Sequence, residues 1–262
     1  MTEALFDTGA FQSFLQPDAV FGASFEYHGE LSSTFDRARV LNREGMPHGT
    51  VILAERQTAG RGRLGRSFHS PGGTGLYFSL LLRPALSLET LLPLTAFAGV
   101  AVCESIMSLT DLRPQCKWPN DVLIGEKKVC GILAESVIGA NVPVIMLGIG
   151  LNVNACSFPP PLEQTAVSLL QSSGRPVSRE KLLAVLLTRL EDLLHTGFTE
   201  NHDAWLTRYR ALCVTPGRRV TITQGNRVRC GLALAVADST ALQVRFDDGT
   251  EELVHSGEVT PG

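Results

Sequence analysis

Two apolar segments, residues 50–54 and 76–82, are typical of buried strands, and a loop rich in glycine and arginine joins them. The loop contains Gly60-Arg61-Gly62-Arg63-Leu64-Gly65-Arg66, and no acidic residue occurs between Glu55 and Glu89. Arginines this close repel one another, so an anionic ligand would offset their repulsion. Glycines allow the backbone to approach such a ligand and to move, and they occur at positions 60, 62, 65, 72, 73 and 75. We therefore expect an anion-binding loop that is mobile without ligand and ordered with it.

Two other interpretations of this loop are a solvated basic loop and an Arg-Gly segment that binds RNA. The chain has 23 Lys and Arg against 26 Asp and Glu, a net charge of −3, whereas nucleic-acid-binding proteins usually carry a basic excess. Only Phe68 and Tyr77 lie near the arginines, although single-strand binders interleave aromatic residues with cations. The glycine spacing also differs from the P-loop and from the Rossmann fingerprint. A nucleotide bound here would be held in another way.

The remaining pattern predicts an α+β chain. Helices are expected at residues 34–45, 88–109, 179–195 and around 204–209, and strands at 122–124, 129–136 and 142–154. From Thr215 onward short strands alternate with turns, which predicts a small antiparallel β-barrel. We accordingly divide the chain into an extension of unknown role at 1–30, a main α+β domain at 31–214 and a β-module at 215–262.

Three further clusters carry polar residues beside apolar strands. Lys117-Trp118-Pro119-Asn120-Asp121 combines a cation, an amide and a carboxylate at a strand break, and a capped turn is its alternative interpretation. Lys128 precedes an apolar strand and would be placed to bind a carboxylate, although a solvated hairpin charge remains open. The segment 148–154, Gly-Ile-Gly-Leu-Asn-Val-Asn, closes a strand with small residues, and Asn152 is a candidate hydrogen-bonding group.

In this order and spacing the motifs resemble those of the biotin protein ligases, over about residues 30–260. The motifs are 57–63 (Gln-Thr-Ala-Gly-Arg-Gly-Arg), 70–79, 117–121, 128–135 and 148–154. The resemblance implies a mixed central sheet flanked by helices and an SH3-like C-terminal barrel. It also implies that the chain joins biotin to a lysine of a biotin carboxyl carrier protein, through biotinyl-5′-AMP made from biotin and Mg·ATP.

The resemblance also assigns roles to individual residues. Lys128 and Arg63 would be catalytic. Biotin would be bound by Ser33, Thr34, Gln57, Gly60, Arg61, Gly62, Arg63, Lys128 and Gly131. The nucleotide would be bound by Arg63, Arg66, Phe68, Lys117, Asn120, Asp121 and Asn152, and the Mg²⁺ ligands are not assigned. Two departures stand out, because Phe35 occupies a place where the family commonly has Asn, and Phe68 one where it often has Trp.

The first alternative function is a lipoate or octanoate ligase of the same superfamily, which would not be expected to carry the Gly-Arg-Gly-Arg loop before the Lys-Trp-Pro-Asn-Asp motif. Some relatives also repress transcription, but the first cation here is Arg37, so we expect no sequence-specific DNA binding. We find no signal peptide and no apolar run of membrane-spanning length, and expect a cytoplasmic protein. A homodimer is left open. The six cysteines are interpreted as small, mostly buried thiols without disulfides.

Overall fold

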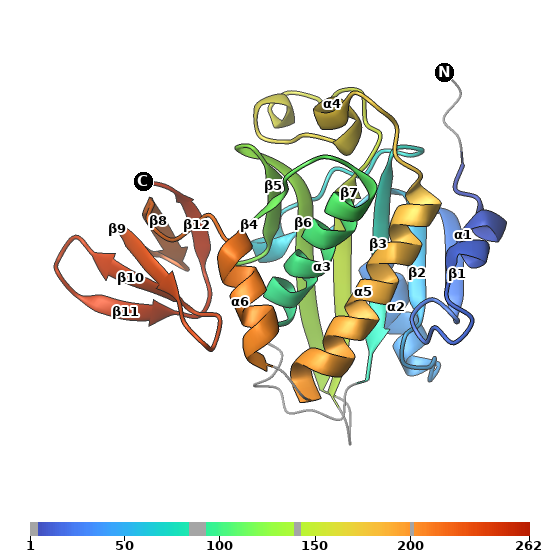
Figure 1. Cartoon of the computed structure of the whole chain (residues 1–262), viewed down its shortest axis with the longest axis horizontal. Coiled ribbons are helices and arrows are strands. Elements are labelled where there is room, and N and C mark those ends of the chain that lie inside the picture. The colour runs from blue at the N-terminus through green and yellow to red at the C-terminus, as the bar shows by residue number, and fades with distance from the viewer. Residues whose placement is uncertain (1–4, 84–92, 139–142, 200–201) are drawn as a thin grey trace.

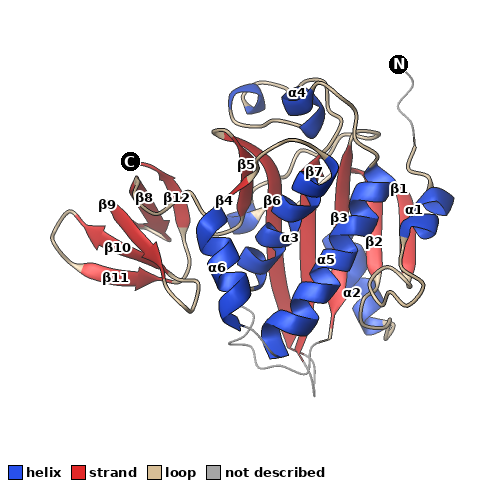
Figure 2. Cartoon of the chain, viewed as in Figure 1, coloured by secondary structure: helices blue, strands red, loops and turns tan. Residues whose placement is uncertain are grey.

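The structure is a computed structural model that describes residues 5–83, 93–138, 143–199 and 202–262. Its main element is a seven-stranded mixed sheet with helices on both faces (Figures 1 and 2). The strands are β1 (Phe25–Leu31), β2 (Val51–Gln57), β3 (Gly75–Leu82), β4 (Gln115–Lys117), β5 (Asp121–Ile124), β6 (Lys127–Ile138) and β7 (Pro143–Asn152), in the order β1-β2-β3-β7-β6-β5-β4. Among the described pairings β1 and β2 run parallel, and the neighbours that follow are antiparallel.

One face of this sheet is covered by α3 (Leu94–Leu109), α5 (Arg179–Thr199) and α6 (His202–Leu212), and the other by α2 (Thr34–Arg43), as Figure 1 shows. The remaining short helical elements are α1 (Thr8–Phe14), η1 (Arg63–Gly65), η3 (Leu162–Gln164) and α4 (Leu169–Ser173). The central α3 is buried on nearly every side, as its low charge predicts.

Side-chain alternation along β7 shows how the two faces differ. Ile145, Leu147, Ile149 and Leu151 belong to the core beneath α3 and α5, whereas Val144 and Met146 pack with α2. The next two positions that face the α2 side are Gly148 and Gly150. The sheet therefore loses its side-chain layer on this side just beyond the end of the α2 core, and a hollow can form there.

A second, five-stranded antiparallel sheet ends the chain. It consists of β8 (Arg219–Gln224), β9 (Arg227–Val236), β10 (Leu242–Phe246), β11 (Glu251–Val254) and β12 (Glu258–Pro261), in the order β11-β10-β9-β8-β12. No described pairing joins its edge strands β11 and β12, so the sheet is open in its hydrogen bonding and the predicted barrel is not confirmed.

Most element predictions are confirmed. Ser178 accepts the Lys181 N–H as a helix cap, although α5 extends past the predicted His195 to Thr199. The predicted start of α3 falls in residues 84–92, which lie outside the described residues. The helices α1 and α4, the strands β1 and β12, and the short 3-10 helices η1 and η3 were not predicted. All six cysteines are free, but Cys156 and Cys230 are exposed, because they lie in a loop and on an outward position of β9.

Candidate active site

The hollow on the α2 side of the sheet is floored by three glycines on adjacent strands. A Cβ at Gly148 would lie 2.0 Å from the Phe35 ring, and one at Gly150 would lie 2.6 Å from the Phe68 ring. A Cβ at Gly131 would lie 2.9 Å from Lys128. Because these contacts are too short for any real side chain, the glycines are what lets two aromatic rings and a lysine lie flat against the sheet.

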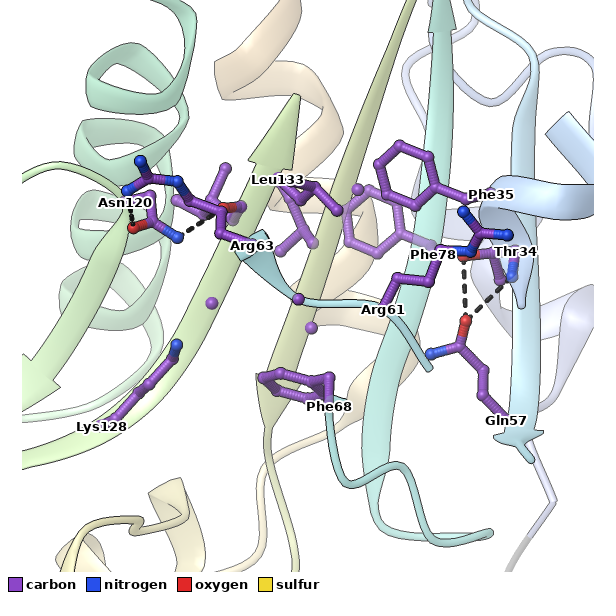
Figure 3. A pocket seen from close by; sticks show the side chains of 16 residues that line it. Thr34, Phe35, Gln57, Arg61, Arg63, Phe68, Phe78, Asn120, Lys128 and Leu133 are labelled. Carbon is purple, nitrogen blue, oxygen red and sulfur yellow. Dashed lines mark hydrogen bonds between the residues drawn. The ribbon is translucent and has the colours of Figure 1, made fainter. Parts of the chain in front are cut away.

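A small cavity of about 50 Å³ lies on this floor, shown in Figure 3. Phe35 of α2 and Leu133 of β6 line it on the α2 side of the sheet, and it also touches Phe78, Ile132 and Ile149, whose side chains belong to the core beneath α3 and α5. Phe35 is only 4% exposed, so it acts as packed wall and supplies no polar group to the cavity. An apolar body with a few polar groups is the usual composition of a small-molecule site.

Polar groups at one end of this cavity are fixed by a chain of hydrogen bonds. The Gln57 Oε1 accepts from the backbone N–H of Thr34 at 2.9 Å and from its hydroxyl at 3.2 Å (Figure 3). Thr34 Oγ1 accepts from Ser79 at 2.8 Å, and Gln57 Nε2 donates to Ser70 at 3.0 Å. The amide orientation of Gln57 is thus set by its partners, and the cavity has a preorganised polar end.

The glycine and arginine loop folds back over the cavity as a tight hairpin. The Gly62 N–H donates to Arg66 at 2.7 Å and the Phe68 N–H to Gly60 at 2.9 Å. Arg61 is held by Asp36 of α2 at 2.6 Å. At the tip, Leu64 has φ 56° and is 70% exposed, a strained backbone conformation for a leucine. The loop is therefore anchored at its base and exposed at its tip.

Arg63 and Lys128 lie where the small cavity opens into a larger one. Arg63 donates to Asn120 Oδ1 at 3.0 Å, and Asn120 Nδ2 donates to the Ile132 carbonyl at 2.8 Å (Figure 3). Burial lowers the pKa of Arg63 from its ordinary 12.5, while Asp121 and Glu258 raise it. The guanidinium stays charged at neutral pH.

Lys128 and Lys127 point in different directions, as the strand alternation predicts. The Lys128 ammonium lies 2.6 Å from Asp121 and lines both cavities. Lys127 donates instead to the Glu163 carbonyl at 2.9 Å and does not line either cavity. One of the two cations therefore faces the site.

The larger cavity measures about 1020 Å³ and lies between the two sheets. It shares Gln57, Gly62, Arg63, Phe68, Asn120 and Lys128 with the small one, so the two form one continuous site. The second sheet lines its far side with residues of β8 and β12, and Glu258 pairs with Arg66. A volume near the top of the range for ligand sites, roughly 300–1,000 Å³, suits a nucleotide.

Trp118 ties the second sheet to this cavity. The indole N–H donates to the Thr240 carbonyl at 2.8 Å and the backbone N–H donates to Thr215 at 2.9 Å. Its ring is 3% exposed. Trp118 therefore connects the second sheet to the first, and it lines the large cavity together with its neighbours in the motif.

The structure brings most residues of the sequence hypothesis together. Thr34, Gln57, Arg61, Gly62, Arg63, Lys128 and Gly131 line the small cavity, with Phe68 and Asn120. Arg66, Lys117, Asp121 and Asn152 line the large one. Ser33 and Gly60 line neither cavity. Ser33 caps α2 through the Phe35 N–H, and a Cβ at Gly60 would meet the Phe68 carbonyl at 2.6 Å.

Other lining residues were not predicted. Phe78, Ile132 and Leu133 lie inside the motifs but were given no role, and Phe35 was noted only as a departure from the family pattern. The second-sheet wall (Arg218, Arg219, Glu258) has no motif of its own. The signal that was available is the glycine pair Gly148 and Gly150, since strand glycines often mark a close approach of another group. Within the described ranges no cluster of three or more His, Cys, Asp or Glu is able to hold a metal ion. None of the described helices combines the length and apolarity needed to cross a membrane.

Comparisons with known proteins agree with this geometry. Residues 31–152 match the model of the biotin/lipoate A/B protein ligase family. The bifunctional ligase/repressor BirA of Bacillus subtilis is 35% identical over 93% of this chain and 75% of its own length. The biotin–[acetyl-CoA-carboxylase] ligase of Mycobacterium tuberculosis is 32% identical over 80% of this chain and 78% of its own. The structure of the Aquifex aeolicus biotin protein ligase in complex with biotin and ATP superposes with a TM-score of 0.80 at 29% identity, covering 92% of this chain and 100% of that one.

Proposed function

The chain belongs to the biotin protein ligase family, and we propose that it attaches biotin to a lysine of a biotin carboxyl carrier protein in an ATP-dependent reaction. The observation that carries this proposal is the two-part site, in which a small cavity lined by both apolar and polar side chains opens at Lys128 and Arg63 into a nucleotide-sized cavity. Relatives named as biotin–[acetyl-CoA-carboxylase] ligases support a carboxylase as the acceptor.

Biotin is proposed to lie in the small cavity, with its ring system against the polar end formed by Gln57 and Thr34. Its carboxylate then points to the junction, where Lys128 and Arg63 lie. The ATP occupies the large cavity, with its α-phosphate at the same junction and its phosphates near Arg66 and Lys117.

In the first step a carboxylate oxygen of biotin attacks the α-phosphorus of ATP, and the bond to the bridging oxygen breaks to release pyrophosphate. Two anions must approach each other, so cations aimed at the reacting oxygens lower the barrier. Lys128 and Arg63 provide two fixed cations, held by Asp121 and Asn120 respectively.

In the second step the acceptor lysine, as the free amine, attacks the acyl carbon and AMP leaves. The amine loses one proton to solvent, and the products are a neutral amide and free AMP. The open large cavity gives the incoming amine access to the junction.

A Mg²⁺ ion is proposed to accompany the nucleotide, where it would neutralise phosphate charge. Asp121 and Asn120 supply a carboxylate and an amide at the large cavity, and Mg²⁺ in nucleotide sites commonly takes one or two carboxylates plus phosphate oxygens. This donor set fits a phosphate-bound ion and not a site made of protein ligands alone.

The remaining finer proposals concern organisation. We propose domain boundaries at residues 30 and 214, an SH3-like arrangement of the second sheet, and a cytoplasmic location. A homodimer and the lack of sequence-specific DNA binding also remain proposals. Size measurements at several concentrations and a DNA-shift assay would test these two.

The decisive experiment is mass spectrometry of the protein with biotin and Mg·ATP. We expect biotinyl-5′-AMP, and one biotinyl group on one lysine after a carrier domain is added. Lipoate in place of biotin is the control for the alternative function. Formation of lipoyl-AMP with no biotinyl-AMP would reject the proposal.

A further inference from the structure

A buried carboxylate outside the proposed machinery joins four separate segments. Glu55 lies on β2 and is 4% exposed. Its carboxylate accepts the Phe6 N–H at 3.1 Å, the Tyr27 hydroxyl at 2.8 Å and the Gly73 N–H at 2.8 Å. The Arg179 guanidinium completes the set, and Arg179 also donates to the Gly75 carbonyl at 3.2 Å.

The electrostatics of this hub keep Glu55 ionised. Burial raises the pKa of Glu55, but the hydrogen bonds from Arg179 and Tyr27 outweigh it and leave the pKa below its ordinary 4.5. Burial and the neighbouring carboxylate raise the pKa of Tyr27 to about 12, so the phenol remains a donor. A buried, fully bonded ion pair tolerates the loss of a partner poorly, and this makes the hub rigid.

One of the four segments leads to the site. Gly73 and Gly75 belong to residues 70–75, the limb by which the ligand-binding loop returns to β3. The other end of this limb is held by Ser70, which accepts from the Gln57 side chain at 3.0 Å. Two side chains of β2, Glu55 and Gln57, therefore hold the return limb 70–75 near its two ends by hydrogen bonds.

The N-terminal segment covers the hub from the other side. The Phe6 ring lies against Phe11 and Tyr27, with centroids 5.8 and 5.9 Å apart, and 5.8 Å from the Arg179 guanidinium carbon. Asp7 caps α1 by accepting the Ala10 N–H and donates its own N–H to Glu180. Residues 5–14 thus exclude water from Glu55.

We infer that Glu55 is a positioning residue that couples the docked segment 5–14 to the return limb 70–75, and so controls how firmly the acyl-adenylate is retained. The N-terminal segment is then a working part of the ligase, although it contacts neither cavity. The retention part rests on the proposed function, and the coupling part does not.

The test compares Glu55→Gln with Glu104→Gln. Glu104 is a matched control, because it joins Arg189 and Arg208 of α5 and α6 far from the loop. Hydrogen exchange of residues 70–75 is measured without ligand. We expect exchange at least about tenfold faster in Glu55→Gln, as for loss of a charge-assisted bond, and no change in Glu104→Gln.

The second readout is the release of biotinyl-5′-AMP from preloaded enzyme. We expect about tenfold faster release in Glu55→Gln and unchanged release in the control Glu104→Gln. Equal release in both variants would overturn the retention role. If the wild-type protein forms no adenylate, the proposed function fails, while the exchange result still decides the coupling.

Phe6→Ala distinguishes loss of the coupling from general unfolding, because it disturbs the N-terminal segment and leaves the ion pair of Glu55 and Arg179 in place. Faster exchange at residues 70–75 in this variant supports the coupling. Unchanged exchange in Phe6→Ala overturns it, and this variant decides the question if Glu55→Gln does not yield folded protein.

Discussion

The two cavities are built in different ways. The small one is floored by strand glycines, walled by buried rings and given a polar end by hydrogen bonds among Thr34, Gln57 and Ser79. The large one lies between two sheets, and exposed ion pairs cross it. The Arg66 side chain, paired with Glu258, is 64% exposed, and the Glu126 side chain, paired with Arg218, is 76% exposed.

Because of this difference, we expect the small cavity to select its ligand and the large cavity to adjust to different ligands. A packed wall has no room to adapt, so the small cavity selects its ligand by shape. Exposed ion pairs contribute roughly 0–1 kcal/mol each, so the walls of the large cavity can shift to admit a nucleotide and then an acceptor. Substitutions at the junction should have the largest effects, those in the small cavity intermediate ones and those in the ion pairs the smallest.

The junction is tested by Lys128→Ala. Loss of a cation that faces the reacting oxygens should slow adenylate formation by about 10²–10³-fold. Lys127→Ala removes the same charge from a position that faces neither cavity and should change the rate little. Single-turnover pyrophosphate release measures both, and equal rates in the two variants would contradict the junction assignment.

Arg63→Ala separates the intermediate from biotin itself. We propose that Arg63 acts at the phosphate, which free biotin lacks, so the variant should release biotinyl-5′-AMP about 10- to 100-fold faster while biotin affinity stays nearly constant. Rapid dilution of preloaded enzyme gives the release rate. A fall in biotin affinity with unchanged release would mean that Arg63 acts on biotin and not on the phosphate.

Gly148→Ala tests the rigidity of the small cavity. Its Cβ would lie 2.0 Å from Phe35, which has no free space, so biotin binding should weaken about tenfold while ATP binding changes little. Titration calorimetry measures both affinities. Gly29→Ala is the control, since a Cβ there meets nothing within 4 Å. Wild-type affinity in Gly148→Ala would mean that the wall adapts after all.

Glu126→Gln tests the adaptable wall of the large cavity and should change the KM for ATP less than about fivefold.

The same ion pair predicts a pH dependence of stability. Hydrogen bonding and attraction from Arg218 hold the pKa of Glu126 below its ordinary 4.5. Any contribution of this ion pair to folding stability is therefore present above pH 4.5 and is lost as the pH falls through the lowered pKa. A pH series of thermal melts for the wild type and Glu126→Gln checks this, with Glu252→Gln of the second sheet as control. A loss near neutral pH would contradict the assignment.

The sequence predicted elements and site residues where the local residue pattern alone reflects their role in the folded protein. The apolar strands, the Ser178 cap and the motif residues from Arg61 to Lys128 were all predicted from spacing and composition, partly through the family resemblance. β1 was missed because Phe-Glu-Tyr-His-Gly-Glu-Leu is an edge strand of intermediate burial and lacks clean alternation. Leu133 looks like any other core residue in the sequence. Its place in the cavity depends on two glycines on a neighbouring strand, and no local pattern records that.

The contacts of Trp118 have a consequence for how this chain can evolve. Its backbone and indole N–H groups are bound by Thr215 and Thr240, which lie before and within the second sheet's segment of the chain. A C-terminal unit exchanged from a distant relative would have to bring both partners in register, or leave a buried indole N–H without an acceptor beside Lys117 and Asn120. Recombination between lineages is therefore expected to transfer the motif and the C-terminal unit together, as one inherited block.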